Sequence, residues 1–255
     1  MMEGLSEPIA ALVAELATMR GAVAITLGGS RALGAVNAGT DWDLGLYYRG
    51  AIDLTPLSAY GTVHPPGSWG RLMNGGAWLQ VGGERVDVLL RDIAVVEQWT
   101  ARAERGEFEV DALLGYTAGV PTYLLMAELA LGRVLWGMLR TVSYPAALAA
   151  SGPGVWRFCR TFSIEYARVH ASRGNHVGAV TQAGKAVMEE AHALMCEQSR
   201  WVCNEKRLID DAGLASVQSL FARVPSEASE LVGWVDQVAD RLGVARDDTM
   251  PWKVR

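Results

Sequence analysis

The sequence has few of the features that mark several protein classes. Its 255 residues include only three cysteines, Cys159, Cys196 and Cys203, and no Cys-x-x-Cys pair. A disulfide framework and a zinc site are therefore disfavoured. The longest apolar stretches, such as 121–131, contain polar residues and fall short of the roughly 18 apolar residues that a membrane-spanning helix needs. The N-terminal segment has acids but no basic residue before its first apolar run, so we expect no signal peptide and a cytoplasmic protein.

Basic charge is also scarce. The formal net charge is −5, and no run of Lys and Arg is longer than two. Proteins that bind nucleic acid usually carry a basic patch, because neutralising phosphates supplies most of the affinity. The acidic net charge therefore disfavours a nucleic-acid partner and suits a small cationic substrate. We also see no histidine pair at metal-ligand spacing and no internal repeat, and the sequence leaves monomer and homodimer equally open.

What the sequence does contain changes in character along the chain. Half of the residues are hydrophobic, which is ordinary for a globular protein with a sizeable core. Apolar spacing predicts a helix over 6–20 and strands over 22–27 and 41–50. Two further strands, AWLQV and ERVDVLLRD, are separated by Gly82-Gly83, a strong hairpin signal.

From about residue 93 the pattern becomes helical. Apolar residues recur with a 3.6-residue period over 93–105, 120–138, 154–173, 176–199 and 226–242. Breaks are expected at Pro145, Ser151-Gly152-Pro153, Gly174-Asn175 and Gly213. These patterns predict an α+β protein with a small mixed β-sheet domain over residues 1–105 and an α-helical bundle domain over 106–255.

The segment from 28 to 48 contains the residues that point to chemistry. The strand over 22–27 leads into Gly28-Gly29-Ser30, where two glycines permit close approach of a bulky anion and the backbone N–H groups of a following helix can bind it. Asp41 and Asp43 then stand two residues apart on a strand, so that both carboxylates project to the same side. Paired carboxylates beside a phosphate-binding turn are ligands that Mg²⁺ prefers.

A third acid lies in the second strand of the predicted hairpin. Asp87 is flanked by Val86 and Val88, and an unpaired carboxylate in such an apolar run is costly to bury. Either it faces solvent or it shares a metal with Asp41 and Asp43. Three carboxylates can hold two ions, one at the attacking oxygen and one at the leaving pyrophosphate.

These residues, in this order, resemble the signature of the DNA polymerase β-type nucleotidyltransferase superfamily. The family pattern is a hydrophobic strand, a G-[GS] turn, a D-h-[DE]-h strand about ten residues later and a later h-[DE]-h strand. Here the pattern reads Gly28-Gly29-Ser30, then Asp41-Trp42-Asp43-Leu44, then Val86-Asp87-Val88. The resemblance covers roughly residues 20 to 92. The helical second half is similar only in architecture to antibiotic nucleotidyltransferases that act on aminoglycosides or lincosamides.

The resemblance implies roles for these positions. Asp41, Asp43 and Asp87 would hold two Mg²⁺ ions, and Asp87 serves as acceptor-side base in some members. Gly28, Gly29 and Ser30 would bind the β- and γ-phosphates of ATP or another NTP, the co-substrate. Arg31, beside Ser30, would add a phosphate contact.

Further candidates have competing structural explanations. In antibiotic adenylyltransferases a lysine of the helical domain reaches the triphosphate; Lys206 is the first candidate here and Lys185 the second, and a solvated lysine is the alternative for Lys206. Glu190 is the candidate acid for a cationic acceptor, although a helix salt bridge is the stronger explanation. Asn74 lies in a glycine-rich loop, where it would contact base or ribose unless it only shapes the turn. Arg91 is predicted to point the same way as Asp87 and to balance its charge or touch the substrate.

The expected function is Mg²⁺-dependent transfer of a nucleoside monophosphate, AMP from ATP being favoured, to a hydroxyl of a small molecule resembling an aminoglycoside. One alternative keeps the chemistry but transfers the nucleotide to tRNA or protein, as toxin-type members do. Another is a nucleotide-binding module without catalysis, which the complete set of carboxylates disfavours. Antibiotic resistance, biosynthesis and toxin action all stay open as roles.

Overall fold

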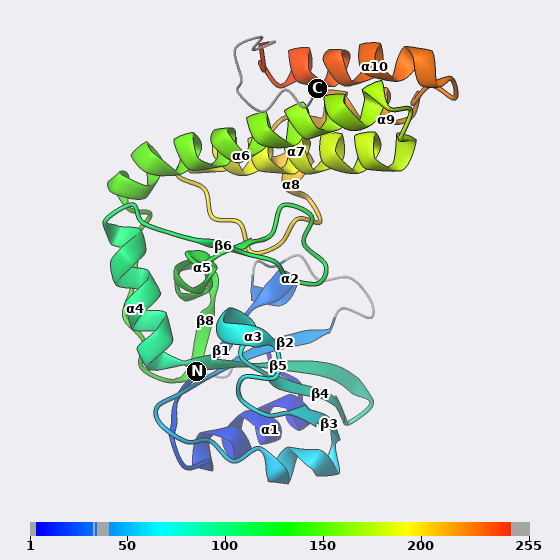
Figure 1. Ribbon diagram of the computed structural model, residues 1–255. Helices are drawn as coiled ribbons and strands as arrows, with labels where there is room; N and C mark the ends of the chain where they lie inside the picture. The colour runs from blue at the N-terminus through cyan, green and yellow to red at the C-terminus, as the bar shows by residue number, and fades with distance from the viewer. Residues whose placement is uncertain (1–3, 33, 35–40, 246–255) are drawn as a thin grey trace. The chain divides into compact units, whose positions relative to one another are not determined.

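The computed structural model describes residues 4–32, 34 and 41–245, and its architecture is α+β, with a six-stranded mixed sheet followed by long helices (Figure 1). The chain forms two compact units. The first comprises Met1–Ala103 and Thr122–Ser143, and the second comprises Glu104–Pro121 and Tyr144–Arg255. The expected division at residue 105 therefore differs from this arrangement, because the chain returns to the first unit over 122–143 to add a helix and an edge strand to the sheet.

The sheet of the first unit has the strand order β3-β4-β5-β2-β1-β8. Its strands are β1 (Ala22–Leu27), β2 (Trp42–Tyr48), β3 (Gly61–His64), β4 (Gly76–Val81), β5 (Glu84–Asp92) and β8 (Arg133–Gly137). The central pair β2 and β5 is parallel, and all other neighbours are antiparallel. The strand predicted over 22–27 and the hairpin around Gly82-Gly83 are confirmed.

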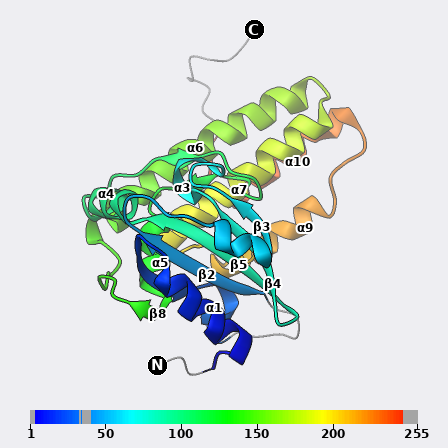
Figure 2. The ribbon, with the colours of Figure 1, turned by 90° about the horizontal axis from the view of Figure 1, so that it is seen from below.

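One face of this sheet is closed by α1 (Glu7–Thr18), which lies across the strands in Figure 2. Alternate strand residues point toward the helix, as the period of two requires. In the central pair these are Trp42, Leu44 and Leu46 opposite Val86, Val88 and Leu90, all buried. The intervening residues of β2 and β5, which include Asp43 and Asp87, therefore face the other side of the sheet.

Part of that second face is covered at the carboxyl end of β5. Arg91 is 1% exposed, and its guanidinium forms a bidentate pair with Glu128 of α5 (Leu124–Leu131) at 2.5 and 2.6 Å. The same guanidinium donates to the Met73 carbonyl in α3 (Gly70–Met73) at 3.1 Å. Arg91 thus anchors two helices to the sheet, and the Glu128 carboxylate balances its charge.

Two sequence expectations about the helical region are corrected. Within 120–138, only Leu124–Leu131 is helical, and Arg133–Gly137 forms β8. This segment pairs with the edge of β1, which supplies backbone hydrogen bonds that local periodicity does not reveal. The expected break at 151–153 is absent, because α6 (Ala146–Ser172) continues through the buried Gly152 and Pro153. A Cβ on Gly152 would lie 2.9 Å from Cys196 Sγ, so glycine here permits close helix packing.

The second unit is built on an antiparallel helical hairpin. Helix α6 packs along α7 (His176–Glu197), with α10 (Ala228–Arg241) against both (Figure 1). The break predicted at Gly174-Asn175 is confirmed: Gly174 has φ +68°, and the Asn175 side chain caps α7 by accepting from the Gly178 N–H at 2.9 Å. The helices predicted over 93–105 and 226–242 are confirmed as α4 (Ile93–Glu104) and α10.

Shorter elements complete the two units. They are the one-turn helices α2 (Gly29–Ala32), α8 (Leu208–Asp211) and α9 (Gln218–Phe221), the 3-10 turns Thr55–Ala59 and Ala215–Val217, and the small strands β6 (Val110–Asp111) and β7 (Val120–Pro121). Across the part of the chain that the structure describes, no helix combines the length and apolar character that crossing a membrane requires.

Candidate functional site

The glycine turn after β1 lies directly against the carboxylate of Asp43. The Gly28 N–H donates to the Asp43 carbonyl at 2.8 Å, which extends the β1–β2 ladder to the turn itself. Gly29 has φ +60°, and a Cβ at this position would overlap the Asp43 carboxylate, lying 2.8 Å from its Cγ. Glycine is therefore required both for the backbone conformation and for space. The glycine turn and Asp43 therefore lie next to each other, and their binding of phosphate and metal stays a prediction.

Asp43 and Asp87 are register partners in the parallel pair β2–β5. Parallel partners point to the same face, and neighbouring strands lie about 4.8 Å apart. The two carboxylates thus emerge side by side from the face opposite α1, each from a position between two buried residues. The hydrophobic neighbours fix the strands, and the alternation turns the acids outward.

Asp41 precedes β2 and makes a different contact. Its Oδ1 lies 2.7 Å from Nε of Arg85, two residues before Asp87 on the same face of β5. The Asp41 side chain is 38% exposed and that of Arg85 is 64% exposed, so solvent screens much of this ion pair and its stabilisation is small, although the Oδ1 atom itself is buried. Asp41 is thus near the Asp43–Asp87 row, with its carboxylate paired to an arginine that our sequence reasoning did not consider.

The start of β2 is held by residues around Trp42. The Trp42 indole N–H donates to Glu84 Oε2 at 2.7 Å, and Glu84 also accepts from the Ser6 hydroxyl. These hydrogen bonds, first from Ser6 and then from Trp42, lower the pKa of Glu84. The Arg31 guanidinium stacks on the Trp42 ring at 3.9 Å from its centroid, and Arg31 Nε donates to the Asp41 carbonyl at 3.2 Å. Arg31 therefore fixes the segment that carries the acids, and its predicted phosphate contact stays a prediction.

The donor set fits a magnesium site that substrate completes. Within the described residues, no group of three or more His, Cys, Asp or Glu side chains is arranged to hold an ion. Mg²⁺, however, is usually bound by one or two carboxylates together with substrate phosphates and water. Asp43 and Asp87 supply two such oxygen donors beside a turn that a side chain would block. Oδ1 of Asp41 is already paired with Arg85, so an ion bound by that oxygen would compete with the arginine.

Asn74, predicted to contact base or ribose, organises the loop before β4. It has φ +64°, its Oδ1 accepts from the Gly67 N–H at 2.9 Å, and its Nδ2 donates to the Tyr48 hydroxyl at 2.7 Å. Its carbonyl accepts from the Trp69 N–H at 3.1 Å. These contacts use both ends of the amide, so the turn-forming explanation accounts for Asn74.

The remaining predicted residues belong to the second unit. Glu190 is buried between Arg157 and Arg160, with nitrogen–oxygen distances of 3.1 and 2.5 Å, so its charge is already balanced. The Lys185 ammonium is 3.7 Å from Glu189, whose pKa is raised by burial. Lys206 is exposed, as a solvated lysine would be. Glu190 thus forms salt bridges, which were the alternative explanation to acceptor binding. The roles of the two lysines stay predictions.

Sequence reasoning missed an aromatic group next to the acids. Trp78 of β4 is the register partner of Asp87 and is 54% exposed. Its ring packs with His64 and Trp69, at centroid distances of 4.5 and 5.5 Å. A signal was present, because a two-residue turn at Gly82-Gly83 fixes which residues of a hairpin face one another.

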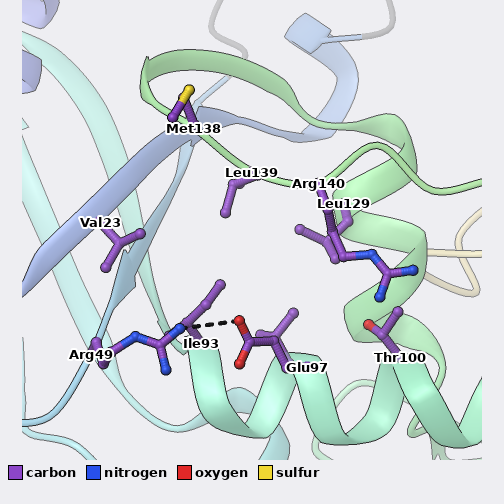
Figure 3. Close-up of a pocket in the computed structure, with 10 residues that line it drawn as sticks. Val23, Arg49, Ile93, Glu97, Thr100, Leu129, Met138, Leu139 and Arg140 are labelled. Atoms are coloured by element: carbon purple, nitrogen blue, oxygen red, sulfur yellow. Dashed lines mark hydrogen bonds and ion pairs between the residues drawn. The ribbon is translucent and has the colours of Figure 1, made fainter.

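A cavity of about 220 Å³ lies elsewhere in the first unit, near the start of β1 rather than at its glycine end (Figure 3). Apolar side chains, among them Val23 and Leu139, line it together with the ion pair between Arg49 and Glu97, whose atoms are 3.1 Å apart. The lining includes none of the predicted acids. The open face carrying Asp43 and Asp87 is therefore the candidate site.

Comparison with known proteins adds little to this assignment. No protein-family model and no curated protein matches the chain. Among solved structures, the chain is similar to an aminoglycoside 6-adenyltransferase from Bacillus subtilis, with 10% identity over 95% of this chain and 92% of that one. The TM-score is 0.26, which is too low for the likeness to support an argument about activity. The candidate site stands on its own residues.

Proposed function

We propose that this protein is a nucleotidyltransferase that moves a nucleoside monophosphate, AMP from ATP in the favoured case, to a hydroxyl group of a small acceptor. The observation that carries the proposal is the row formed by the glycine turn, Asp43 and Asp87 on one open face of the sheet. A glycine turn beside two neighbouring carboxylates suits a nucleoside triphosphate with its divalent cation.

The residues divide into two groups by position. Gly29 and Ser30 open α2, where the first N–H groups lack acceptors within the helix, and they would contact the β- and γ-phosphates. Gly28 joins this turn to β1, and its N–H is already bonded to the Asp43 carbonyl. Asp43 and Asp87 would hold the cation. When bound, Mg²⁺ would neutralise charge on the reacting phosphates.

The reaction balances without a further reagent. The acceptor oxygen forms a bond to the α-phosphorus, and the bond from that phosphorus to the β-phosphate bridging oxygen breaks to release pyrophosphate. Asp87, farther from the glycine turn than Asp43 in the row, would accept the hydroxyl proton. Most of the acceleration would come from alignment and charge balance, as in phosphoryl transfer generally.

The direct test uses ATP labelled at the α-phosphate, Mg²⁺ and a panel of aminoglycosides and lincosamides. We expect label in a small product, and loss of at least about 100-fold in rate for Asp43→Asn and Asp87→Asn, since each removes a cation ligand. Glu97→Gln is the matched control, because Glu97 is an exposed acid of the same unit that lines the cavity of Figure 3 and not the candidate site. Wild-type rates in Asp43→Asn would refute the assignment, and label in tRNA or protein instead would identify a macromolecular acceptor.

A further inference from the structure

The aromatic group beside Asp87 lies in a defined position relative to the acids. Reading across the sheet on the face opposite α1, the order is Gly28 at the end of β1, Asp43 on β2, Asp87 on β5 and Trp78 on β4. Facing residues on antiparallel strands have Cβ atoms about 5 Å apart. The Trp78 ring therefore begins within one strand spacing of the Asp87 carboxylate.

Trp78 is held rigidly while leaving much of its ring open. His64 meets it nearly edge-on, with an interplanar angle of 66°, and Trp69 stacks on it at 27°. Trp69 is itself fixed by the loop that Asn74 closes. Despite both contacts, 54% of Trp78 stays exposed. We call His64, Trp69 and Trp78 the aromatic platform; a ligand that stacks on it meets a surface already ordered, so little side-chain entropy is lost.

The order of the row decides which substrate the platform meets. The attacking and leaving oxygens lie roughly in line through the α-phosphorus in this reaction. If the pyrophosphate leaves on the side of the glycine turn, the acceptor hydroxyl approaches from the opposite side, past Asp87. Trp78 lies on that side. This placement of the acceptor rests on the proposed function, in which the phosphates lie at Gly29.

We propose that the aromatic platform binds the acceptor, and that the acceptor is a hydroxylated ring bearing a cationic amine. The ring face would pack on Trp78, and its amine would lie over the indole or beside Asp87, since both attract cations. The rings of His64 and Trp69 complete an aromatic wall around Trp78, and such a surface suits the C–H face of a saturated ring.

The experiment measures acceptor and nucleotide binding separately by calorimetry on the full chain. The probes are kanamycin, streptomycin and spectinomycin as cationic hydroxylated rings, and α,β-methylene-ATP with Mg²⁺ as the nucleotide. We expect Trp78→Ala to weaken binding of the ring probe about 3- to 30-fold, the range for a lost cation–π contact, and to change nucleotide affinity less than about twofold. Trp78→Phe should restore most of the loss.

Trp136→Ala is the matched control. Trp136 is 39% exposed and lies on β8, the edge strand at the end of the sheet far from β4. Far-UV circular dichroism checks that each variant folds. Equal ring-probe affinity in Trp78→Ala and Trp136→Ala, or no binding of any ring probe to the wild type, would overturn the proposal. Selective loss of nucleotide affinity in Trp78→Ala would show that the platform holds the base instead.

The same data separate this inference from the proposed function. Ring probes that bind in a Trp78-dependent manner to a protein that binds no Mg²⁺–nucleotide would disprove nucleotidyl transfer and leave the platform as a binding site. If the wild type binds the Mg²⁺–nucleotide and Trp78→Ala binds every probe as the wild type does, nucleotidyl transfer would remain supported and the role of the aromatic platform would be disproved.

Discussion

Gly29→Ala is the sharpest perturbation of the candidate site, because one methyl group meets the Asp43 carboxylate. The added Cβ would overlap that group, with Cγ at only 2.8 Å, whereas ordinary van der Waals contacts begin at 3.4 Å. The carboxyl carbon would have to move by at least about 0.6 Å, and its oxygen by more. A displacement near 1 Å in a catalytic group can cost about 100-fold in rate, so we expect that loss in turnover and a clear loss in cation affinity.

The positive φ at Gly29 adds a separate cost in folding free energy, which two control variants distinguish from the overlap with Asp43. Gly29 has φ +60°, and a side chain in the left-handed region costs about 1–2 kcal/mol. Gly50 has φ +77° with nothing within 4 Å of an added Cβ, so Gly50→Ala carries the strain without the overlap. Gly28→Ala would make only ordinary contacts, at 3.7 and 3.8 Å, and should be tolerated.

The assay needs no knowledge of the acceptor. Mn²⁺ binding in the presence of α,β-methylene-ATP is followed by electron paramagnetic resonance, and urea unfolding by circular dichroism reports stability. Gly29→Ala and Gly50→Ala should lose similar stability, while only Gly29→Ala loses Mn²⁺ affinity. Equal Mn²⁺ affinity in the two variants would refute the placement of Asp43 at the cation site.

Two further predictions concern charge. Arg85→Ala removes the partner of Asp41, so we expect Mn²⁺ to bind about two- to fivefold more tightly, a small gain because the ion pair is exposed; weaker binding in the same titration would contradict Arg85 as a competitor. Burial raises the pKa of Glu189, so the folded protein binds the carboxyl proton more tightly than the unfolded chain does. The protonated carboxyl therefore stabilises the folded state at pH values below the unfolded-state pKa. This stabilisation is lost as the pH rises through the folded-state pKa. The urea midpoint of Glu189→Gln should therefore exceed that of the wild type at neutral pH, with the difference shrinking toward pH 4; a constant difference across pH would show that this carboxyl does not titrate as described.

Much of the first unit could be predicted from the sequence because its signals are local. Six apolar residues ending in two glycines predict β1 and its turn, and a two-residue glycine turn predicts the β4–β5 hairpin. Alternation between buried and outward positions also put Asp43 and Asp87 away from the core. Local periodicity is informative here because each strand has one buried face.

Local signals failed where a distant segment decides the structure. Arg133–Gly137 has an apolar pattern that fits a helix, but it became a strand because the edge of β1 offered unpaired backbone groups. Pro153 is a helix breaker by composition, yet α6 continues through it because packing on α7 outweighs one lost hydrogen bond.

The chemistry divides in the same way. The sequence by itself determined which residues can serve, namely a glycine turn and three acids in a given order along the chain. Only the tertiary structure decided their partners: Asp43 beside Asp87, Asp41 paired with Arg85, and Glu190 already neutralised by two arginines. The reason is that strand pairing and ion pairing join residues far apart in the chain, and their free energies depend on distances that spacing in a sequence does not specify.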